Sequence, residues 1–71
     1  MNFQTRYNKM DDKECEICKN KIQSQAIYMV ISQVLDNTYA EIYAHVSCFA
    51  QVTQNHIRYE NLKKRMSELC Q

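Results

Sequence analysis

Alternating polar and apolar positions mark two predicted strands in the middle of the chain. Residues 26–35 and 39–44 are rich in β-branched and aromatic side chains, which are typical of half-buried strands. Asp36 and Asn37 lie between them as a two-residue turn signal. The pattern therefore predicts a β-hairpin. A loop of this length fixes the register, which pairs Val34 with Tyr39, Ile31 with Ile42 and Val30 with Tyr43.

The two faces of this hairpin differ in character. One face carries Ile27, Met29, Ile31, Ala40, Ile42 and Ala44. The other face carries Tyr28, Val30, Ser32, Val34, Tyr39, Glu41 and Tyr43. We expect the first face to be the core side, because it is uniformly apolar. The second face is either an exposed aromatic surface or is covered by the C-terminal helix or the N-terminal arm.

Helical periodicity begins where the second strand ends. Steps of three and four residues place one set of positions on a single helix stripe, namely His45, Cys48, Val52, Asn55, Tyr59, Leu62, Met66 and Leu69. The pattern predicts either one continuous helix from His45 or two helices with a bend at Gln54 and Asn55, because asparagine favours turns.

The chain has 71 residues and contains neither glycine nor proline, so no flexible linker divides it. We expect one domain over residues 15–71, preceded by a polar N-terminal arm over residues 1–14. The arm is either a frayed terminus or packs onto the domain through Phe3 and Tyr7. A domain of this size has a marginal core and benefits from a covalent or metal staple.

Two close pairs of metal-binding residues supply a candidate staple. Cys15 and Cys18 are separated by two residues, and His45 and Cys48 repeat this spacing after 26 intervening residues. Thiolates with one imidazole form a ligand set that Zn²⁺ prefers, and each pair can hold one side of a tetrahedral ion. The sequence therefore predicts one structural zinc ion. Two disulfides are the alternative, although they leave the position of the histidine unexplained.

Two further residues carry expectations about this site. Asn20 is our candidate for the positive-φ position of the backbone turn that follows Cys18, because asparagine tolerates that conformation better than most residues. Cys70 lies one residue from the end of the sequence and is expected to be a free or semi-buried thiol.

A cysteine knuckle, a hairpin and a helix whose first turn supplies the second ligand pair resemble the treble-clef zinc fingers. The resemblance covers residues 15–52. The order Cys15, Cys18, His45, Cys48, followed by Phe49, is similar to the Cys-Cys-His-Cys fingers of poly(ADP-ribose) polymerases and to half of a LIM domain. The resemblance implies a small zinc-stabilised α+β fold. The polymerase fingers recognise DNA breaks, so a resemblance to them would also imply that function for this chain.

Charge and hydropathy restrict the function classes. The formal net charge is +1, which favours neither a general nucleic-acid binder nor an acidic tail. No secretory signal and no apolar run of membrane-spanning length is visible, so we expect a soluble cytoplasmic protein. Four protein ligands would close the zinc site to chemistry. We therefore expect no enzymatic activity, and a relative of the HNH-type nucleases is the less favoured alternative.

Two binding hypotheses remain for the function. The first is a protein partner, with the chain acting as an adaptor or regulator, for example of transcription or of a host factor. Its predicted contact residues are Tyr28, Tyr39, Tyr43 and Val30. The second hypothesis is DNA binding through the basic flank of the last helix, formed by Arg58, Lys63, Lys64 and Arg65. Because residues 26–44 contain no Lys or Arg, we favour the protein partner. The short heptad-like pattern of the last helix also allows a homodimer.

Overall fold

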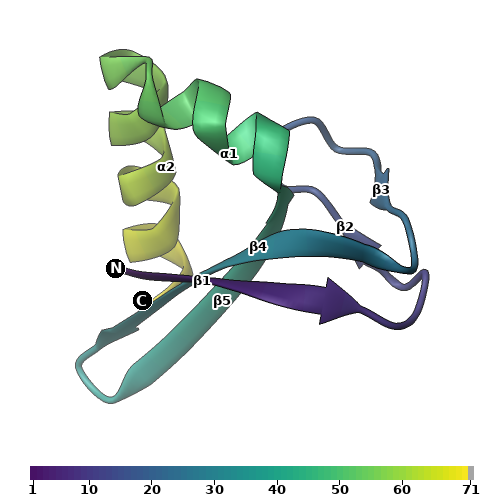
Figure 1. Cartoon of the computed structure of the whole chain (residues 1–71). Coiled ribbons are helices and arrows are strands. Elements are labelled where there is room, and N and C mark those ends of the chain that lie inside the picture. The colour runs from purple at the N-terminus through teal and green to yellow at the C-terminus, as the bar shows by residue number, and fades with distance from the viewer. Residues whose placement is uncertain (71) are drawn as a thin grey trace.

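A computed structural model describes residues 1–70 and shows an α+β fold (Figure 1). Its elements along the chain are β1 (Asn2–Asn8), β2 (Lys13–Glu14), β3 (Lys21–Ile22), β4 (Ala26–Leu35), β5 (Thr38–His45), α1 (Val46–Thr53) and α2 (His56–Leu69). Strands β1, β4 and β5 form one antiparallel sheet in that order, and β2 pairs with β3 as a separate ribbon. The two helices follow the last strand and cover one face of the sheet.

The predicted hairpin is confirmed in its position and register. Strands β4 and β5 pair Val34 with Tyr39 and Ile31 with Ile42. Asp36 and Asn37 have φ angles of 51° and 64°, so both turn residues adopt the left-handed region. A two-residue turn with positive φ at both positions matches the right-handed twist of the flanking strands, which explains why this short connection suits the hairpin.

The polar arm that the sequence sets apart from the domain forms a strand of its sheet. Strand β1 pairs along its whole length with β4, and Phe3 lies opposite Ile31 and Tyr7 opposite Ile27. A frayed terminus is therefore not what the structure shows. Sequence reasoning missed this strand because its side chains are mostly polar and exposed, whereas its pairing uses backbone groups. The alternation of Phe3, Thr5 and Tyr7 with polar neighbours was the available signal.

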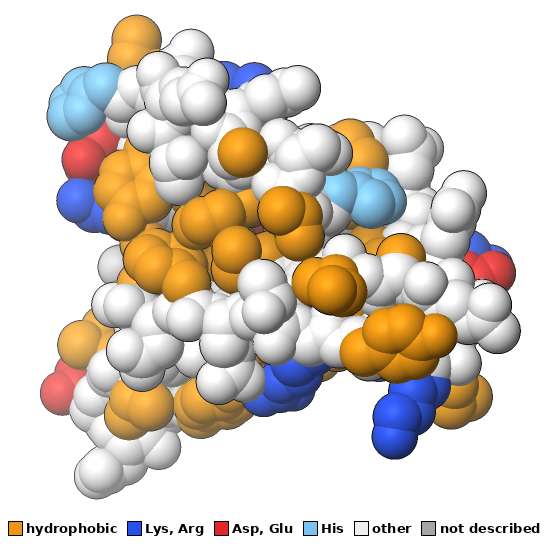
Figure 2. All heavy atoms as spheres, viewed as in Figure 1, with side chains coloured by type: hydrophobic (Ala, Val, Ile, Leu, Met, Phe, Trp, Pro, Cys, Tyr) orange, Lys and Arg blue, Asp and Glu red, His pale blue; other side chains and the backbone are white. Residues whose placement is uncertain are grey.

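Most of the core lies between the helices and the first face of the hairpin, as expected, although Tyr28 and Val30 of the second face are also buried. Ile31 and Ala44 from the sheet pack with Val52 from α1 and with Met66 from α2, and all four are at most 3% exposed. Ile27 shares this face but remains 62% exposed. The core thus occupies only the part of the face that the helices reach, and apolar side chains beyond it remain visible beside β1 (Figure 2).

The opposite face of the sheet is covered by polar side chains instead of by a helix. The Lys13 ammonium lies 5.5 Å from the centre of the Tyr28 ring and 5.6 Å from that of Tyr43. Arg6 forms an ion pair with Glu41 at 3.4 Å on this same face. These contacts cover the sheet surface and support the burial of Tyr28.

The helical region divides at the predicted bend. Helix α1 ends at Thr53 and α2 begins at His56, which confirms the two-helix alternative. Asn55 caps α2, since its side-chain oxygen accepts a hydrogen bond from the Arg58 backbone N–H at 3.1 Å. Within residues 1–70, no helix is long and apolar enough to cross a membrane.

Candidate metal centre

The first ligand pair lies in the tight turn that joins β2 to β3. The backbone N–H of Cys15 donates to the carbonyl of Asn20 at 2.8 Å, and the N–H of Lys19 donates to the carbonyl of Cys15 at 2.9 Å. Lys19 has a φ angle of 64°, whereas Asn20 has no positive φ. The prediction for Asn20 is therefore wrong by one position. The chain must reverse at once after Cys18 for these two bonds to form, so the left-handed residue is the one that follows this ligand directly.

The second ligand pair lies at the junction of β5 and α1. His45 ends the strand with extended backbone angles and occupies the N-cap position of α1 without a side-chain capping hydrogen bond, and Cys48 follows in the first helical turn. The turn bearing the first pair docks on this strand, because the Glu16 N–H donates to the carbonyl of Tyr43 at 2.8 Å. The hairpin thus brings His45 close to Cys18, which lies 27 positions earlier in the chain.

The four ligand atoms form a compact cluster. One atom from each of Cys15, Cys18, His45 and Cys48 lies within 4.8 Å of the others. Nδ1 of His45 lies 3.4 Å from Sγ of Cys18 and 3.7 Å from Sγ of Cys48. A tetrahedral zinc ion with the usual Zn–S and Zn–N bond lengths separates such atoms by about 3.6 Å. The cluster therefore fits one structural zinc ion, held by the four predicted residues.

Backbone N–H groups near the Cys15 sulfur favour its thiolate form. Burial alone raises the pKa of the Cys15 thiol, but hydrogen bonds to its sulfur outweigh that effect and lower the pKa to about 6. The N–H groups of Cys18 and His45 point at this sulfur at 3.5 and 3.4 Å. These donors stabilise a thiolate, which is the form that binds zinc.

Cys48 shows the opposite tendency in the metal-free cluster. Burial and then the neighbouring sulfurs of Cys15 and Cys18 raise the pKa of the Cys48 thiol to about 11. A thiolate at Cys48 would be a third negative charge beside the sulfurs of Cys15 and Cys18, which is unfavourable unless a cation balances it. A divalent ion supplies that balance, because a coordinated thiol loses its proton outright. The electrostatics of the cluster therefore agree with its geometry.

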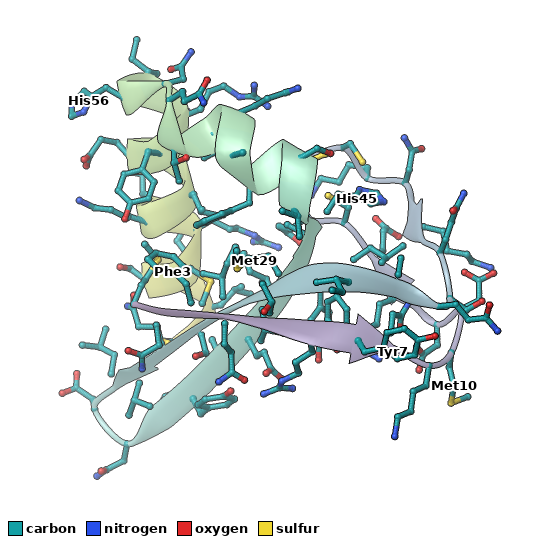
Figure 3. The ribbon with its side chains drawn as sticks, in the orientation of Figure 1. Phe3, Tyr7, Met10, Met29, His45 and His56 are labelled. Carbon is teal, nitrogen blue, oxygen red and sulfur yellow. The ribbon has the colours of Figure 1, made fainter. Side chains whose placement is uncertain are left out.

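None of the cysteines in the described part of the chain forms a disulfide. The three cysteines of the cluster are therefore free to bind a metal ion. Cys70 does not join the cluster. Cys70 lies at the C-terminal end of α2, and its side chain is 3% exposed. Its sulfur lies 3.5 Å from the backbone carbonyl oxygen of Gln33 in β4. It is thus a buried core thiol. His56 begins α2 and lies far from His45 (Figure 3).

The predicted tyrosine surface is smaller than the sequence indicates. Tyr28 and Val30 are only 4% and 1% exposed, so they cannot contact a partner in the folded chain. Tyr43 is half-buried, and Tyr39 is 58% exposed at the edge of the sheet. The reason is tertiary, since the covering residues Arg6 and Lys13 come from the N-terminal segment that the sequence analysis set apart.

The basic residues of α2 do not form one continuous flank. Lys63 forms an ion pair with Glu60 at 3.1 Å, and Arg65 forms one with Glu16 at 3.0 Å. Arg58 and Arg65 instead line a cleft of about 330 Å³ beside the first ligand pair. Lys64 is exposed and is not among the residues that line this cleft. Sequence reasoning missed the cleft because it combines residues from the ligand turn and from both helices.

Comparison with known proteins assigns this chain to no family, so its class is defined by its fold and its metal-binding geometry. No family model matches the chain, and no curated protein or solved structure shows significant similarity to it. The fold and the four-ligand cluster together define a small zinc-stabilised α+β domain.

Proposed function

We propose that this chain is a non-catalytic zinc module of treble-clef type that binds a protein partner. The observation that carries the proposal is the cleft beside the zinc site. A closed set of four protein ligands provides no open coordination position for a reaction. The zinc then serves to hold the ligand turn against the helices, and this packing forms the walls of the cleft. The order of knuckle, hairpin and helix supports the treble-clef assignment, with β1 as an additional strand.

The floor of the cleft is apolar and its rim is positively charged. Ile17 from the ligand turn, Val52 from α1 and Leu62 from α2 supply the apolar lining. Binding sites for peptides and small molecules combine such an apolar surface with a few polar groups that fix orientation. The cleft therefore suits a side chain with an apolar body.

The rim of the cleft adds a preference for negative charge. Glu16 is the acidic residue of the lining and already pairs with Lys19 at 3.3 Å and Arg65 at 3.0 Å. Among residues 1–70, Arg58 forms no ion pair, so its guanidinium remains available to a ligand. Arginine binds carboxylates in a two-pronged geometry. We infer that the partner presents an acidic group next to apolar side chains.

A protein partner explains these features better than DNA does. Nucleic-acid affinity comes largely from many cations that contact phosphates. Here Lys63 and Arg65 have acidic partners within the chain, and the formal net charge is only +1. An apolar floor also offers little to a phosphate backbone. DNA binding through α2 is therefore our second candidate, and it makes a distinct prediction in the same experiment.

The test is capture of proteins from a lysate of the source organism, with and without nuclease treatment, followed by quantitative mass spectrometry. We compare the zinc-loaded wild type with Arg58→Glu and with Lys64→Glu, which reverses an exposed charge of α2 outside the cleft. The proposal predicts at least one protein that the wild type and Lys64→Glu capture, that Arg58→Glu loses, and that nuclease does not release. Capture that disappears with nuclease, or equal capture by all three proteins, contradicts it.

A further inference from the structure

Strand β1 is an open edge of the three-stranded sheet. The opposite edge strand, β5, meets the ligand turn near its C-terminal end, where the Glu16 N–H donates to the carbonyl of Tyr43 at 2.8 Å. Within the described residues 1–70, strand β1 pairs with β4 alone, and it lies in the foreground of Figure 1 at the margin of the sheet. Natural edge strands are commonly protected by lysine, proline, a bulge or short length. β1 has seven residues and contains neither lysine nor proline.

The sequence of β1 reads similarly in both directions from its central residue, Thr5. The flanking residues form matched pairs of long polar, aromatic and amide side chains, which are Gln4 with Arg6, Phe3 with Tyr7, and Asn2 with Asn8. A two-fold axis beside Thr5 would place each residue opposite its counterpart from a second copy of the chain. A surface that is complementary to itself in this way is what a two-fold symmetric dimer requires.

We propose that β1 pairs antiparallel with β1 of a second copy, centred on Thr5, so that two three-stranded sheets join into one. The ladder runs over residues 3–7. It leaves out Asn8, because the side chain of Asn8 is fully buried and is held by the carbonyls of Ile22 and Gln23 within its own chain. This inference goes beyond the proposed function, and its surface contains no residue of the cleft.

Side chains on the helix-covered face favour this register. Phe3 and Tyr7 are 42% and 56% exposed, and Phe3 contacts Phe49 of α1 with ring centres 5.1 Å apart. They lie at opposite ends of β1 (Figure 3). The two-fold pairing sets Phe3 against Tyr7 of the partner subunit on each side of the axis. Aromatic pairs directly opposite each other are among the stabilising cross-strand contacts of antiparallel sheets.

Charges on the other face are compatible with the same register. Arg6 is the single charged residue of β1, and it already pairs with Glu41 at 3.4 Å. In the two-fold arrangement it faces Gln4 of the partner subunit, so no like charges stand opposite one another. The formal charge of +1 per chain adds little repulsion between two copies.

The area available indicates a reversible dimer. Roughly half of each ring of Phe3 and Tyr7 is exposed, and an aromatic side chain buries about 150–250 Å² when fully covered, so four rings supply roughly 400 Å². The backbone ladder and flanking side chains add to this area. The total buried area still lies near or below about 1,200 Å², which is the size of the smallest stable interfaces. We therefore expect a dissociation constant of about 1–100 μM.

A disulfide across the axis tests the position of the interface. Directly opposite residues of an antiparallel pair have Cα atoms about 4.5–5.5 Å apart, which a disulfide can bridge. Zinc-loaded Thr5→Cys in a glutathione redox buffer should form a covalent dimer through residue 5, identified by peptide mapping, whereas the wild type should not. Circular dichroism and zinc content confirm that the variant is folded.

Two further variants test the register. Gln4→Cys alone should not cross-link, because residue 4 lies opposite residue 6 and away from its own copy. An equimolar mixture of Gln4→Cys and Arg6→Cys should give the mixed dimer. Cross-linking of Gln4→Cys with itself at the same rate as Thr5→Cys would contradict the register and overturn the proposal in this form.

Sedimentation equilibrium of the zinc-loaded protein provides the measurement without cross-linking. Tyr7→Lys places a charge at the interface and should raise the dissociation constant at least tenfold. Tyr39→Lys is the matched control, because Tyr39 has a similar exposure, 58%, on the opposite edge strand, and its variant should dimerise like the wild type. A wild type that stays monomeric up to about 1 mM, or a dimer that Tyr39→Lys disrupts and Tyr7→Lys preserves, overturns the proposal.

Discussion

Nδ1 of His45 lies 3.4 Å from the sulfur of Cys18, although 26 residues separate the two along the chain. The turn of β2 and β3 supplies the sulfur and the end of β5 supplies the imidazole. Between them runs the hairpin, which brings both residues to the same end of the sheet. A zinc ion at this point would link the ligand turn to the start of α1, so the metal would connect the two halves of the fold.

Removal of the metal should therefore unfold the domain. A small core cannot replace the roughly 10–16 kcal/mol of apparent binding free energy that structural zinc contributes in zinc-finger peptides. We expect excess chelator to abolish the cooperative thermal transition seen by circular dichroism, and added zinc to restore it. Chelator already saturated with zinc is the control. A domain that keeps its transition after complete metal removal would show that the core alone holds the fold.

Met66 should matter more to stability than any exposed residue of α2. It is fully buried between the helices and the sheet, so Met66→Ala should lower the free energy of unfolding by about 2–5 kcal/mol. Ile57→Ala is the matched control, because Ile57 is 72% exposed on the same helix and its truncation should cost less than about 0.5 kcal/mol. Equal effects of the two substitutions in zinc-loaded protein, measured by denaturant titration, would contradict the packing described for α2.

The turn after Cys18 offers a test of backbone conformation. Lys19 has a φ of 64°, a conformation that costs about 1–2 kcal/mol for a residue with a Cβ and nothing for glycine. Glycine also loses more entropy on folding, by about 0.5–1 kcal/mol, so Lys19→Gly should be neutral or stabilising by up to about 1.5 kcal/mol. The exposed ion pair of Lys19 with Glu16 contributes little.

The neighbouring substitution provides the contrast. Asn20 has no positive φ, so Asn20→Gly should destabilise the zinc-loaded domain by about 0.5–1 kcal/mol. Thermal unfolding of both variants under the same zinc concentration compares them directly. A stabilised Asn20→Gly together with a destabilised Lys19→Gly would restore the assignment made from the sequence.

Asn8 anchors the end of β1 to the turn that follows β3. Its side chain is fully buried, and Nδ2 donates to the carbonyls of Ile22 and Gln23 at 3.2 and 2.9 Å. Asn8→Ala removes both donors and should lower the free energy of unfolding by about 1–3 kcal/mol in urea titrations. Asn2→Ala, at the exposed start of the same strand, should change it by less than about 0.5 kcal/mol. Comparable losses in both variants would argue against this anchoring role.

The elements that the sequence predicted best are those with a local physical signal. β-branched and aromatic residues around Asp36 and Asn37 specify the hairpin and its register, and the paired spacing of cysteines and histidine specifies the ligand cluster. Strand β1 carries a weaker local signal, the alternation of Phe3, Thr5 and Tyr7 with polar neighbours, because most of its side chains are polar and exposed.

The remaining differences arise from tertiary contacts that carry no local signal. Lys13 lies against Tyr28, and Arg6 pairs with Glu41, so the predicted tyrosine surface is partly covered by residues distant in the sequence. The position of the left-handed residue at Lys19 depends on hydrogen bonds to Cys15 and Asn20, which set how sharply the chain turns. Asparagine's preference for this conformation was too weak to locate it.

The zinc content of purified protein tests the central claim most directly. Inductively coupled plasma mass spectrometry should find one zinc ion per wild-type chain, and the same content in Cys70→Ser, because the Cys70 sulfur lies near Gln33 and outside the cluster. Cys48→Ser should lose stoichiometric zinc, since it removes one of the four ligands. Full zinc content in Cys48→Ser, or its loss in Cys70→Ser, would contradict the assigned metal centre.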